Sequence, residues 1–224
     1  MDLVKKSLKD KKELTLLQQV YRFFAFLLAQ GLKHTPITPN FISVVNFLAG
    51  LLAALAFAFG NPIAGILFGQ AAVFLDFADG ALARAKNMSS EFGLWLELIL
   101  GDRIADVFII LGIVLSLNST TAWIFGCLFV AGRLFLNSIN DYISLYPNFS
   151  QIKEQITGKV YSYKGTFGKV MRQFVYTRVN HYIILTLGVI FNHILLALAL
   201  LTVYVWFFFV TMSITFTIKA RKVL

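Results

Sequence analysis

Three long stretches of this chain contain no Asp, Glu, Lys or Arg, and they limit its fold more than any other feature. They cover residues 41–75, 107–132 and 183–218. The first and third are each about 35 residues long, and one helix of that length would measure about 50 Å, whereas the hydrocarbon core of a bilayer is about 30 Å thick. All three stretches have turn-forming residues near the middle, namely Gly60-Asn61-Pro62, Asn118-Ser119-Thr120-Thr121 and Asn192-His193.

These turns predict three helical hairpins, and therefore an all-α integral membrane protein with six transmembrane helices. The expected helices cover 41–60, 62–86, 91–117, 120–145, 176–191 and 194–218. A β-barrel does not fit, because the apolar runs are continuous and do not alternate. A soluble domain does not fit either, because 58% of the residues are hydrophobic and 14% are charged, whereas about a quarter are charged in soluble domains.

Basic residues indicate which side of the membrane each loop faces. The chain has 20 Lys and Arg against 11 Asp and Glu, which gives a net charge of +9. The expected hairpin turns contain no Lys or Arg, whereas the N-terminal segment, the 146–175 loop and the last residues contain most of them. Because basic residues are enriched in cytoplasmic loops, both termini and this loop are expected in the cytoplasm. Topology and anionic lipids then explain the positive charge, and no nucleic acid is needed.

The segment before the first expected span is apolar but interrupted by polar residues. Between residues 13 and 35 these are Gln18, Gln19, Arg22, Gln30 and Lys33. Such a pattern is typical of an amphipathic helix that lies along the cytoplasmic interface. A seventh span is the alternative, but it would break the even number of spans that the basic residues require. The expected organisation is a cytoplasmic N-terminus with an interfacial helix at 1–40, followed by one six-span domain at 41–224.

Acidic residues occur where a membrane protein rarely tolerates them. Six of the 11 acids lie between residues 76 and 106, and five of these fall inside expected transmembrane helices: Asp76, Asp79, Glu97, Asp102 and Asp106. A lone carboxylate in hydrocarbon is costly, and few basic residues are near enough in sequence to balance this group. Divalent cations are therefore the expected counter-charge. Asp76 and Asp79 share a helix face. On the antiparallel partner helix, Asp102 is expected at the depth of Asp76 and Glu97 near the depth of Asp79.

The same region carries a recognisable motif. The run from Asp76 through Asp79-Gly80 and Ala83-Arg84, followed by eight residues and then Gly93, resembles the signature D-x2-D-G-x2-A-R-x8-G-x3-D-x3-D of the CDP-alcohol phosphotransferases, also called CDP-alcohol phosphatidyltransferases. The first half matches at every fixed position. In the second half Glu97 replaces the first Asp, and the next acid, Asp102, comes one residue late.

This extra residue predicts a local change of helix type. On a regular α-helix Glu97 and Asp102 would lie about 140° apart, on different faces. A π-bulge near Leu98–Gly101 would bring them to about 40° apart, and such bulges are frequent at functional sites. We therefore expect a π-bulge there. If the helix is instead regular, Asp102 and Asp106 become the pair that shares a face.

The resemblance implies an enzyme of phospholipid biosynthesis. Such an enzyme transfers a phosphatidyl-type group from a CDP-activated lipid to a small polar alcohol and releases CMP. It also implies a divalent cofactor, with two Mg²⁺ ions expected and Mn²⁺ as the alternative, since an all-carboxylate site suits such ions. The expected partners are the lipid donor, the alcohol acceptor, membrane lipids and a second copy of the chain, and the active site would face the cytoplasm.

The resemblance also assigns roles to individual residues. Asp76, Asp79 and Glu97 would bind the first metal, and Asp102 would complete the second site or act as the catalytic base. Gly80 and Arg84, with Asn40 as a further candidate, would hold the CDP group. Asp106 would be an alternative ligand, or a partner of Arg103 that supports the site.

The acceptor pocket is expected on the fourth helix. Arg133, Asn137 and Asp141 recur there every four residues on one face, which is typical of a hydrophilic pocket. Asp141 counts against a phosphorylated acceptor, for which the resemblance implies basic residues in this region. A phosphate on the acceptor could bind to Lys164, Lys169, Arg172 and Arg178, but each of these residues is rather expected to be solvated. No histidine is assigned a role.

Other interpretations remain open on the sequence alone. Asp76 and Asp79 could form a structural ion pair with Arg84, Gly80 could serve helix packing only, and Glu97 could be an acid at the membrane entrance. At the level of function, the alternatives are a cation transporter that uses the same carboxylates and a relative that has lost catalysis.

Overall fold

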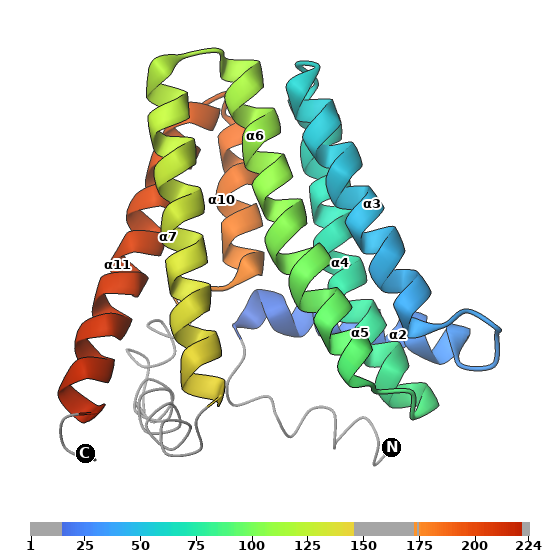
Figure 1. Ribbon diagram of the computed structural model, residues 1–224. Coiled ribbons are helices and arrows are strands. Elements are labelled where there is room, and N and C mark those ends of the chain that lie inside the picture. Colours follow the sequence, from blue (N-terminus) through green and yellow to red (C-terminus); the bar gives the residue numbers. More distant parts are fainter. Residues whose placement is uncertain (1–14, 146–172, 174, 221–224) are drawn as a thin grey trace.

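The computed structural model describes residues 15–145, 173 and 175–220, and all regular elements in that part are helices (Figure 1). Their bounds are α2 (Leu16–Leu32), α3 (Pro39–Ala58), α4 (Pro62–Lys86), α5 (Glu91–Leu96), the π-helix η2 (Glu97–Ile104), α6 (Ala105–Leu117), α7 (Thr120–Leu145), α10 (Arg178–Ile190) and α11 (Ile194–Ala220). Residues 1–14 and most of the expected cytoplasmic loop lie outside the described part.

Local sequence signals set the ends of these helices. Thr38 caps α3 and is followed by Pro39 at the first helical position, and Asn61 caps α4 in the same way before Pro62. The three expected hairpin turns are present: the chain has a positive φ at Gly60, at Asn118 and at Asn192. Glycine and asparagine tolerate this left-handed conformation best, so the predicted turns are confirmed and have a local physical cause.

Four helices are long and apolar enough to cross a membrane, at Pro39–Ala58, Pro62–Lys86, Thr120–Asp141 and Ile194–Ile218. The two other expected spans are helical at the predicted positions but do not reach this length as single α-helices. The 91–117 segment is divided among α5, η2 and the 13-residue α6, because the π-helix interrupts it. The other, α10, has 13 residues. Six spans are therefore not confirmed, although six helical segments are present.

Small residues let α3 and α6 approach closely. A Cβ added at Gly112 would lie 2.2 Å from the carbonyl oxygen of Ala54, and one added at Gly50 would lie 2.7 Å from Cβ of Ala105. Such close packing through small side chains is typical of membrane helices. It places Ala105, at the beginning of α6, directly against Gly50 of α3. Figure 1 shows α3 and α4 on one side of the bundle and α7 and α11 on the other.

The amphipathic helix expected at 13–35 appears as α2, which lies across one end of the bundle (Figure 1). Ala25 and Ala29 are buried and form a small core with Ala78 and Leu82 of α4. Its opposite face is apolar and exposed, with Leu16, Val20, Phe23, Phe24 and Leu27 among the exposed residues. The helix is present at the predicted position, with one buried face and one exposed apolar face. Its place at a membrane interface stays a prediction.

Lys86, at the end of α4, connects two elements. Its Nζ donates hydrogen bonds to the carbonyl oxygens of Thr35 at 2.6 Å and Ile37 at 2.7 Å. These bonds tie the α2–α3 linker to the end of α4. They bring the beginning of α3, including Asn40, next to the motif residues of α4.

Candidate functional site

A cavity of about 400 Å³ lies where the beginning of α3, the end of α4 and α5 meet. Its lining residues are Pro39, Asn40, Ser43, Asp79, Gly80, Ala83, Arg84, Met88, Ser89, Ser90, Glu91, Gly93 and Leu94. Four predicted site residues, Asn40, Asp79, Gly80 and Arg84, thus share one cavity although they come from two helices.

Two glycines of the motif line this cavity. A Cβ added at Gly93 would lie 3.1 Å from Oδ1 of Asn40, so any larger residue there would press on Asn40. A Cβ added at Gly80 would lie 3.4 Å from Nη1 of Arg84, which places the guanidinium group beside the Gly80 backbone. Arg84 is exposed to the cavity and forms no ion pair with Asp76 or Asp79 in the part of the chain that is described. The structural pair that the sequence leaves open is therefore absent there.

Each of the two motif aspartates accepts a hydrogen bond from a neutral side chain of α3. The hydroxyl group of Ser43 donates to Oδ2 of Asp79 at 2.6 Å, and the backbone N–H of Gly80 donates to Oδ1. The amide of Asn46 donates to Oδ1 of Asp76 at 3.2 Å. Asp79 is buried, with 3% of its surface exposed. Both carboxylates thus have fixed orientations on the face of α4 that packs against α3.

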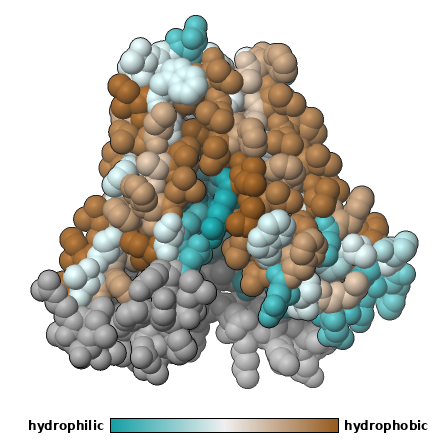
Figure 2. Space-filling view, viewed as in Figure 1, coloured by the Kyte–Doolittle hydropathy of each residue, from teal (hydrophilic) through white to brown (hydrophobic). Residues whose placement is uncertain are grey.

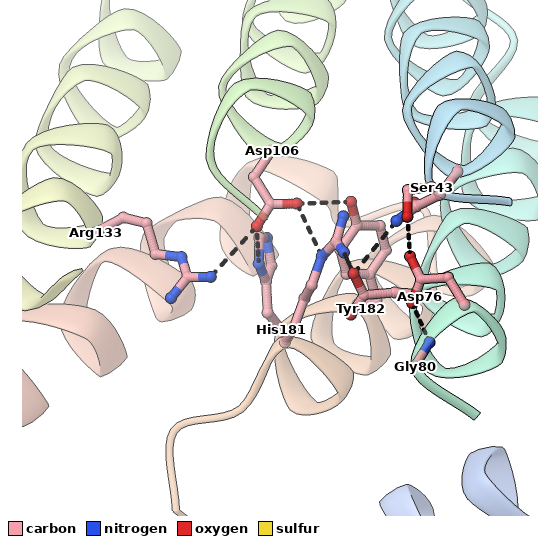
Figure 3. A network of polar contacts seen from close by, with 10 residues as sticks. Ser43, Asp76, Gly80, Asp106, Arg133, His181 and Tyr182 are labelled. Carbon is pink, nitrogen blue, oxygen red and sulfur yellow. Dashed lines mark hydrogen bonds and ion pairs between the residues drawn. The ribbon is translucent and has the colours of Figure 1, made fainter. Parts of the chain in front are cut away.

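A second polar cluster surrounds Asp106, which is 2% exposed (Figure 3). The Tyr182 hydroxyl donates to Oδ1 at 2.9 Å, and Nε of Arg178 donates to the same atom at 3.3 Å. On the other oxygen, Nη2 of Arg133 lies at 3.6 Å and Nδ1 of His181 at 3.9 Å. Arg178 also reaches Asp76, with Nη1 3.0 Å from Oδ1, so it links the two clusters.

Several of these contacts differ from the sequence-based expectations. Arg178 is not solvated: only 8% of its side chain is exposed, because Thr177 caps α10 and Arg178 begins that helix inside the bundle. Arg103 forms its ion pair with Asp141, and not with Asp106. His181 is buried beside Asp106, although the sequence analysis assigns it no role.

The predicted acceptor residues separate into two groups. Arg133 donates to Oδ1 of Asn137 at 3.2 Å, and both residues are almost buried. The Arg133 guanidinium also lies 5.3 Å from the ring centre of Tyr176, which is a cation–π contact. Asp141, one turn further along α7, contacts Arg103 of η2 instead. Its charge is therefore compensated locally and does not face Arg133.

Sequence reasoning did not single out Ser43, Asn46 or Tyr182. A signal for the first two exists, because Asn40, Ser43 and Asn46 recur every three residues in an otherwise apolar helix. Polar residues in a membrane helix usually face a partner or a site. No comparable pattern marks Tyr182, which is one of several aromatic residues in an apolar segment.

The predicted change of helix type is confirmed. Residues Glu97–Ile104 form a π-helix, in which backbone hydrogen bonds join residues five positions apart. Glu97 and Asp102 are five positions apart, so their backbone positions are one π-turn from each other. The alternative of a regular α-helix at this point is therefore excluded. The side chains of Glu97 and Asp102 lie outside the described part.

The chemistry of the described donors suits a hard divalent cation. Asp76 and Asp79 offer carboxylate oxygens one helical turn apart on α4, and Asp79 lines the cavity. Such oxygens are the ligands that Mg²⁺ and Mn²⁺ prefer. Among the described residues no group of three or more His, Cys, Asp or Glu could hold a metal ion by itself. Completing such a site therefore requires ligands beyond the two described here. The predicted ligands Glu97 and Asp102 belong to η2, and their side chains lie outside the described part.

Figure 2 shows hydrophilic surface in a hollow between the hydrophobic sides of the molecule. This arrangement admits a polar group from one end of the bundle while the outer surface stays apolar. The hydrophobic sides agree with the four helices that are long and apolar enough to cross a membrane.

Comparison with known proteins gives consistent results. The family model described as CDP-alcohol phosphatidyltransferase matches residues 36–218. The archaetidylinositol phosphate synthase of Pyrococcus horikoshii is 32% identical over 175 residues, which are 78% of this chain and 80% of that protein. A bifunctional IPC transferase and DIPP synthase of Aquifex aeolicus is 36% identical over 95 residues, which are 41% of this chain and 22% of that protein.

Solved structures show the same fold. The phosphatidylinositol phosphate synthase PgsA1 of Mycobacterium tuberculosis, in complex with manganese and citrate, aligns with a TM-score of 0.65 at 19% identity, covering 86% of this chain and 88% of that one. The same protein with CDP-DAG bound aligns with a TM-score of 0.55 at 22% identity, covering 86% and 92%.

Proposed function

Because the chain belongs to the CDP-alcohol phosphatidyltransferase family, we propose that it transfers a phosphatidyl-type group from a CDP-activated lipid to a small polar alcohol and releases CMP. The observation that carries this proposal is the cavity in which Asn40, Asp79, Gly80 and Arg84 meet. These residues come from the motif and from the beginning of α3.

The donor is proposed to place its diphosphate in this cavity. Arg84 would bind it through the two parallel N–H groups of its guanidinium, which match phosphate geometry. Asn40 and the backbone at Gly80 would contact the rest of the CDP group. A neighbour of known structure was solved with CDP-DAG bound, which supports a CDP-lipid as the donor.

The metal ligands are proposed to be Asp76, Asp79, Glu97 and Asp102. A bound Mg²⁺, or Mn²⁺ as in one structural neighbour, would supply positive charge beside the diphosphate and stabilise the departing CMP. Ser43 and Asn46 orient the carboxylates of Asp79 and Asp76 for this task. Asp102 is also proposed as the base that accepts the proton of the acceptor hydroxyl, whose oxygen forms the new bond to phosphorus.

The acceptor is proposed to be a phosphorylated polyol, with inositol phosphate first. Two relatives are named for products that contain inositol phosphate. Arg133 and Asn137, nearly buried on α7, would contribute to the acceptor pocket. Asp141, whose charge counts against a phosphorylated acceptor in the sequence, is paired with Arg103.

The membrane arrangement is part of the same proposal. The four long helices, the α5–η2–α6 segment and α10 would form six spans, with 1–40 as a cytoplasmic region and both termini in the cytoplasm. The exposed apolar face of α2 supports its place at the cytoplasmic interface. A homodimer is proposed from the family resemblance.

One assay tests the proposal. Purified protein in detergent receives radiolabelled CDP-lipid, with diacyl and diether tails in separate reactions, Mg²⁺ or Mn²⁺, and a panel of inositol phosphate, inositol, glycerol phosphate and serine. We expect CMP release with inositol phosphate, and loss of at least about a hundredfold in Asp76→Asn and Asp102→Asn. Glu154→Gln, an acid far from the motif in sequence, is the control.

Two results would contradict the proposal. CMP release that is unchanged in both variants would reject the metal ligands. No CMP release with any acceptor, together with Mn²⁺ uptake by liposomes that contain the protein, would instead favour the cation transporter.

A further inference from the structure

Arg178 occupies an unusual position in the described part of the chain. It is the first residue of α10, and its guanidinium lies between an acid of α4 and an acid of α6. Nη1 is 3.0 Å from Oδ1 of Asp76, and Nε is 3.3 Å from Oδ1 of Asp106. The group also lies 5.6 Å from the ring centre of Tyr182. One nearly buried cation thus holds two acids that are 30 positions apart in the sequence.

The two acids depend on Arg178 to different degrees. Asp106 has a second cation, Arg133, on its other oxygen, and it accepts a hydrogen bond from the Tyr182 hydroxyl. It would keep both contacts if Arg178 moved away. Asp76 is the acid that belongs to the proposed metal site, and its contact with Arg178 is the shorter of the two ion pairs.

The contact with Asp76 conflicts with metal binding. Oδ1 of Asp76 accepts a hydrogen bond from the amide of Asn46, and Nη1 of Arg178 lies 3.0 Å from the same oxygen as an ion pair. A divalent cation that used this oxygen would compete with these contacts. It would also lie within a few ångströms of a guanidinium of the same sign, in surroundings of low dielectric constant where repulsion is strong.

We propose that Arg178 competes with the divalent cation for Asp76: it neutralises Asp76 and Asp106 in the metal-free protein, and its release from Asp76 sets how tightly the cation binds. The inference rests on the proposed metal dependence and concerns the regulation of that site. Arg178 acts here as a positioning residue through Asp76. Arg178 thereby compensates the charge of the buried acids before the cation binds. Because Arg178 can return to Asp76, the cation can also leave the site.

The test measures metal affinity directly, without turnover. Metal-free protein in detergent is titrated with Mn²⁺, and free Mn²⁺ is followed by electron paramagnetic resonance. Removing the positive charge in Arg178→Met is expected to tighten Mn²⁺ binding by between about fivefold and a hundredfold, the usual range of coupling between two sites. The same variant should unfold at a lower temperature without Mn²⁺ and gain more than the wild type when Mn²⁺ is added.

Three further variants make the result specific. Arg178→Lys keeps the charge, so its affinity should stay close to that of the wild type. Arg178→Gln replaces Arg178→Met if the latter does not fold. Arg133→Met removes the other cation of Asp106 and should also lower the unfolding temperature, but it should change Mn²⁺ affinity much less, because its contact is with the acid outside the proposed metal site.

The outcomes separate the two proposals. If the wild type shows no saturable Mn²⁺ binding, both the proposed metal-dependent function and the proposed competition by Arg178 are wrong. If the wild type binds Mn²⁺ but Arg178→Met and Arg178→Gln bind it equally or more weakly, Arg178 does not compete, and only this inference is overturned.

Discussion

Ser43 shows how one neutral residue can control an acid of the proposed site. Its hydroxyl donates to Asp79, which is almost fully buried, and the other described donor to that carboxylate is the N–H of Gly80. A buried carboxylate that loses a donor retains the cost of desolvation without compensation. The orientation of Asp79 toward the cavity therefore depends on Ser43, which is uncharged and lies outside the motif.

Ser43→Ala is expected to reduce kcat/KM by between about tenfold and a hundredfold, because Asp79, the proposed metal ligand, and the cavity wall lose their fixed position. Stability should fall by about 1–2 kcal/mol. The measurements are CMP release and thermal unfolding in detergent. Ser138→Ala is the matched control, since Ser138 is exposed and bonds only within its own helix, to the Leu134 carbonyl. If both substitutions reduced activity and stability equally, the predicted role of Ser43 in orienting Asp79 would be wrong.

At the scale of elements, the π-helix η2 accommodates one extra residue between two regular helices. Because it takes up that residue locally, the faces that α5 and α6 present to the bundle need not change. In an α-helix, positions four apart lie about 40° apart. Deleting one residue of η2 would therefore convert the spacing between Glu97 and Asp102 into the four-residue spacing of the motif without rotating either neighbour.

Deleting Leu100 is accordingly expected to leave CMP release within about tenfold of the wild type. Deleting Phe108, an exposed residue of the regular helix α6, is the matched control. It should abolish activity, because the following residues rotate by about 100° and lose their packing against α3. Activity assays and circular dichroism of both variants give the answer. Loss of activity in both would show that η2 has a role beyond spacing.

The close contact of α3 and α6 predicts that a larger side chain at Gly112 destabilises the protein. Gly112→Val would place atoms within 2.2 Å of the Ala54 carbonyl and force the helices apart. The expected result is a loss of stability of about 3 kcal/mol or more, with a parallel loss of activity, because Asp106 moves with α6. Gly31→Ala in α2 is the control: nothing lies within 4 Å of the added Cβ, so this helix should become slightly more stable.

On the face that Figure 2 shows, a hydrophilic hollow lies between the hydrophobic sides of the molecule. The proposed topology places residue 34 and the cavity on the cytoplasmic side, and the turns of the hairpins on the opposite side. The surface charge does not by itself reveal this orientation in the described part, because many of the basic residues lie in the terminal segments and in the 146–172 range outside it.

Cysteine labelling in intact cells checks the orientation. In a Cys127→Ser background, Thr121→Cys in the second hairpin turn should react with a membrane-impermeant maleimide from outside. His34→Cys, which is equally exposed in the α2–α3 linker, should react only after the cells are opened. The reverse labelling pattern would invert the topology, and labelling of both from outside would contradict the three spans expected between these two residues.

Much of the arrangement along the chain could be read from the sequence, because the signals that set it are local. Charge-free runs, with Gly60, Asn118 and Asn192 at their turns, mark the helical segments. The single inserted residue between Glu97 and Asp102 predicts the π-helix, since helix register depends only on spacing. The motif identifies the family, which the comparisons confirm.

Only the tertiary structure decided which charges meet. Arg178 lies 102 positions after Asp76 and 72 after Asp106, and Asp141 lies 38 after Arg103. No periodicity relates residues so far apart, because their contact depends on how α4, α6, α7 and α10 rotate and pack against one another. Helix packing therefore brought Arg178 to both acids, turned Asp141 toward Arg103, and placed Ser43 and Asn46 against the motif aspartates.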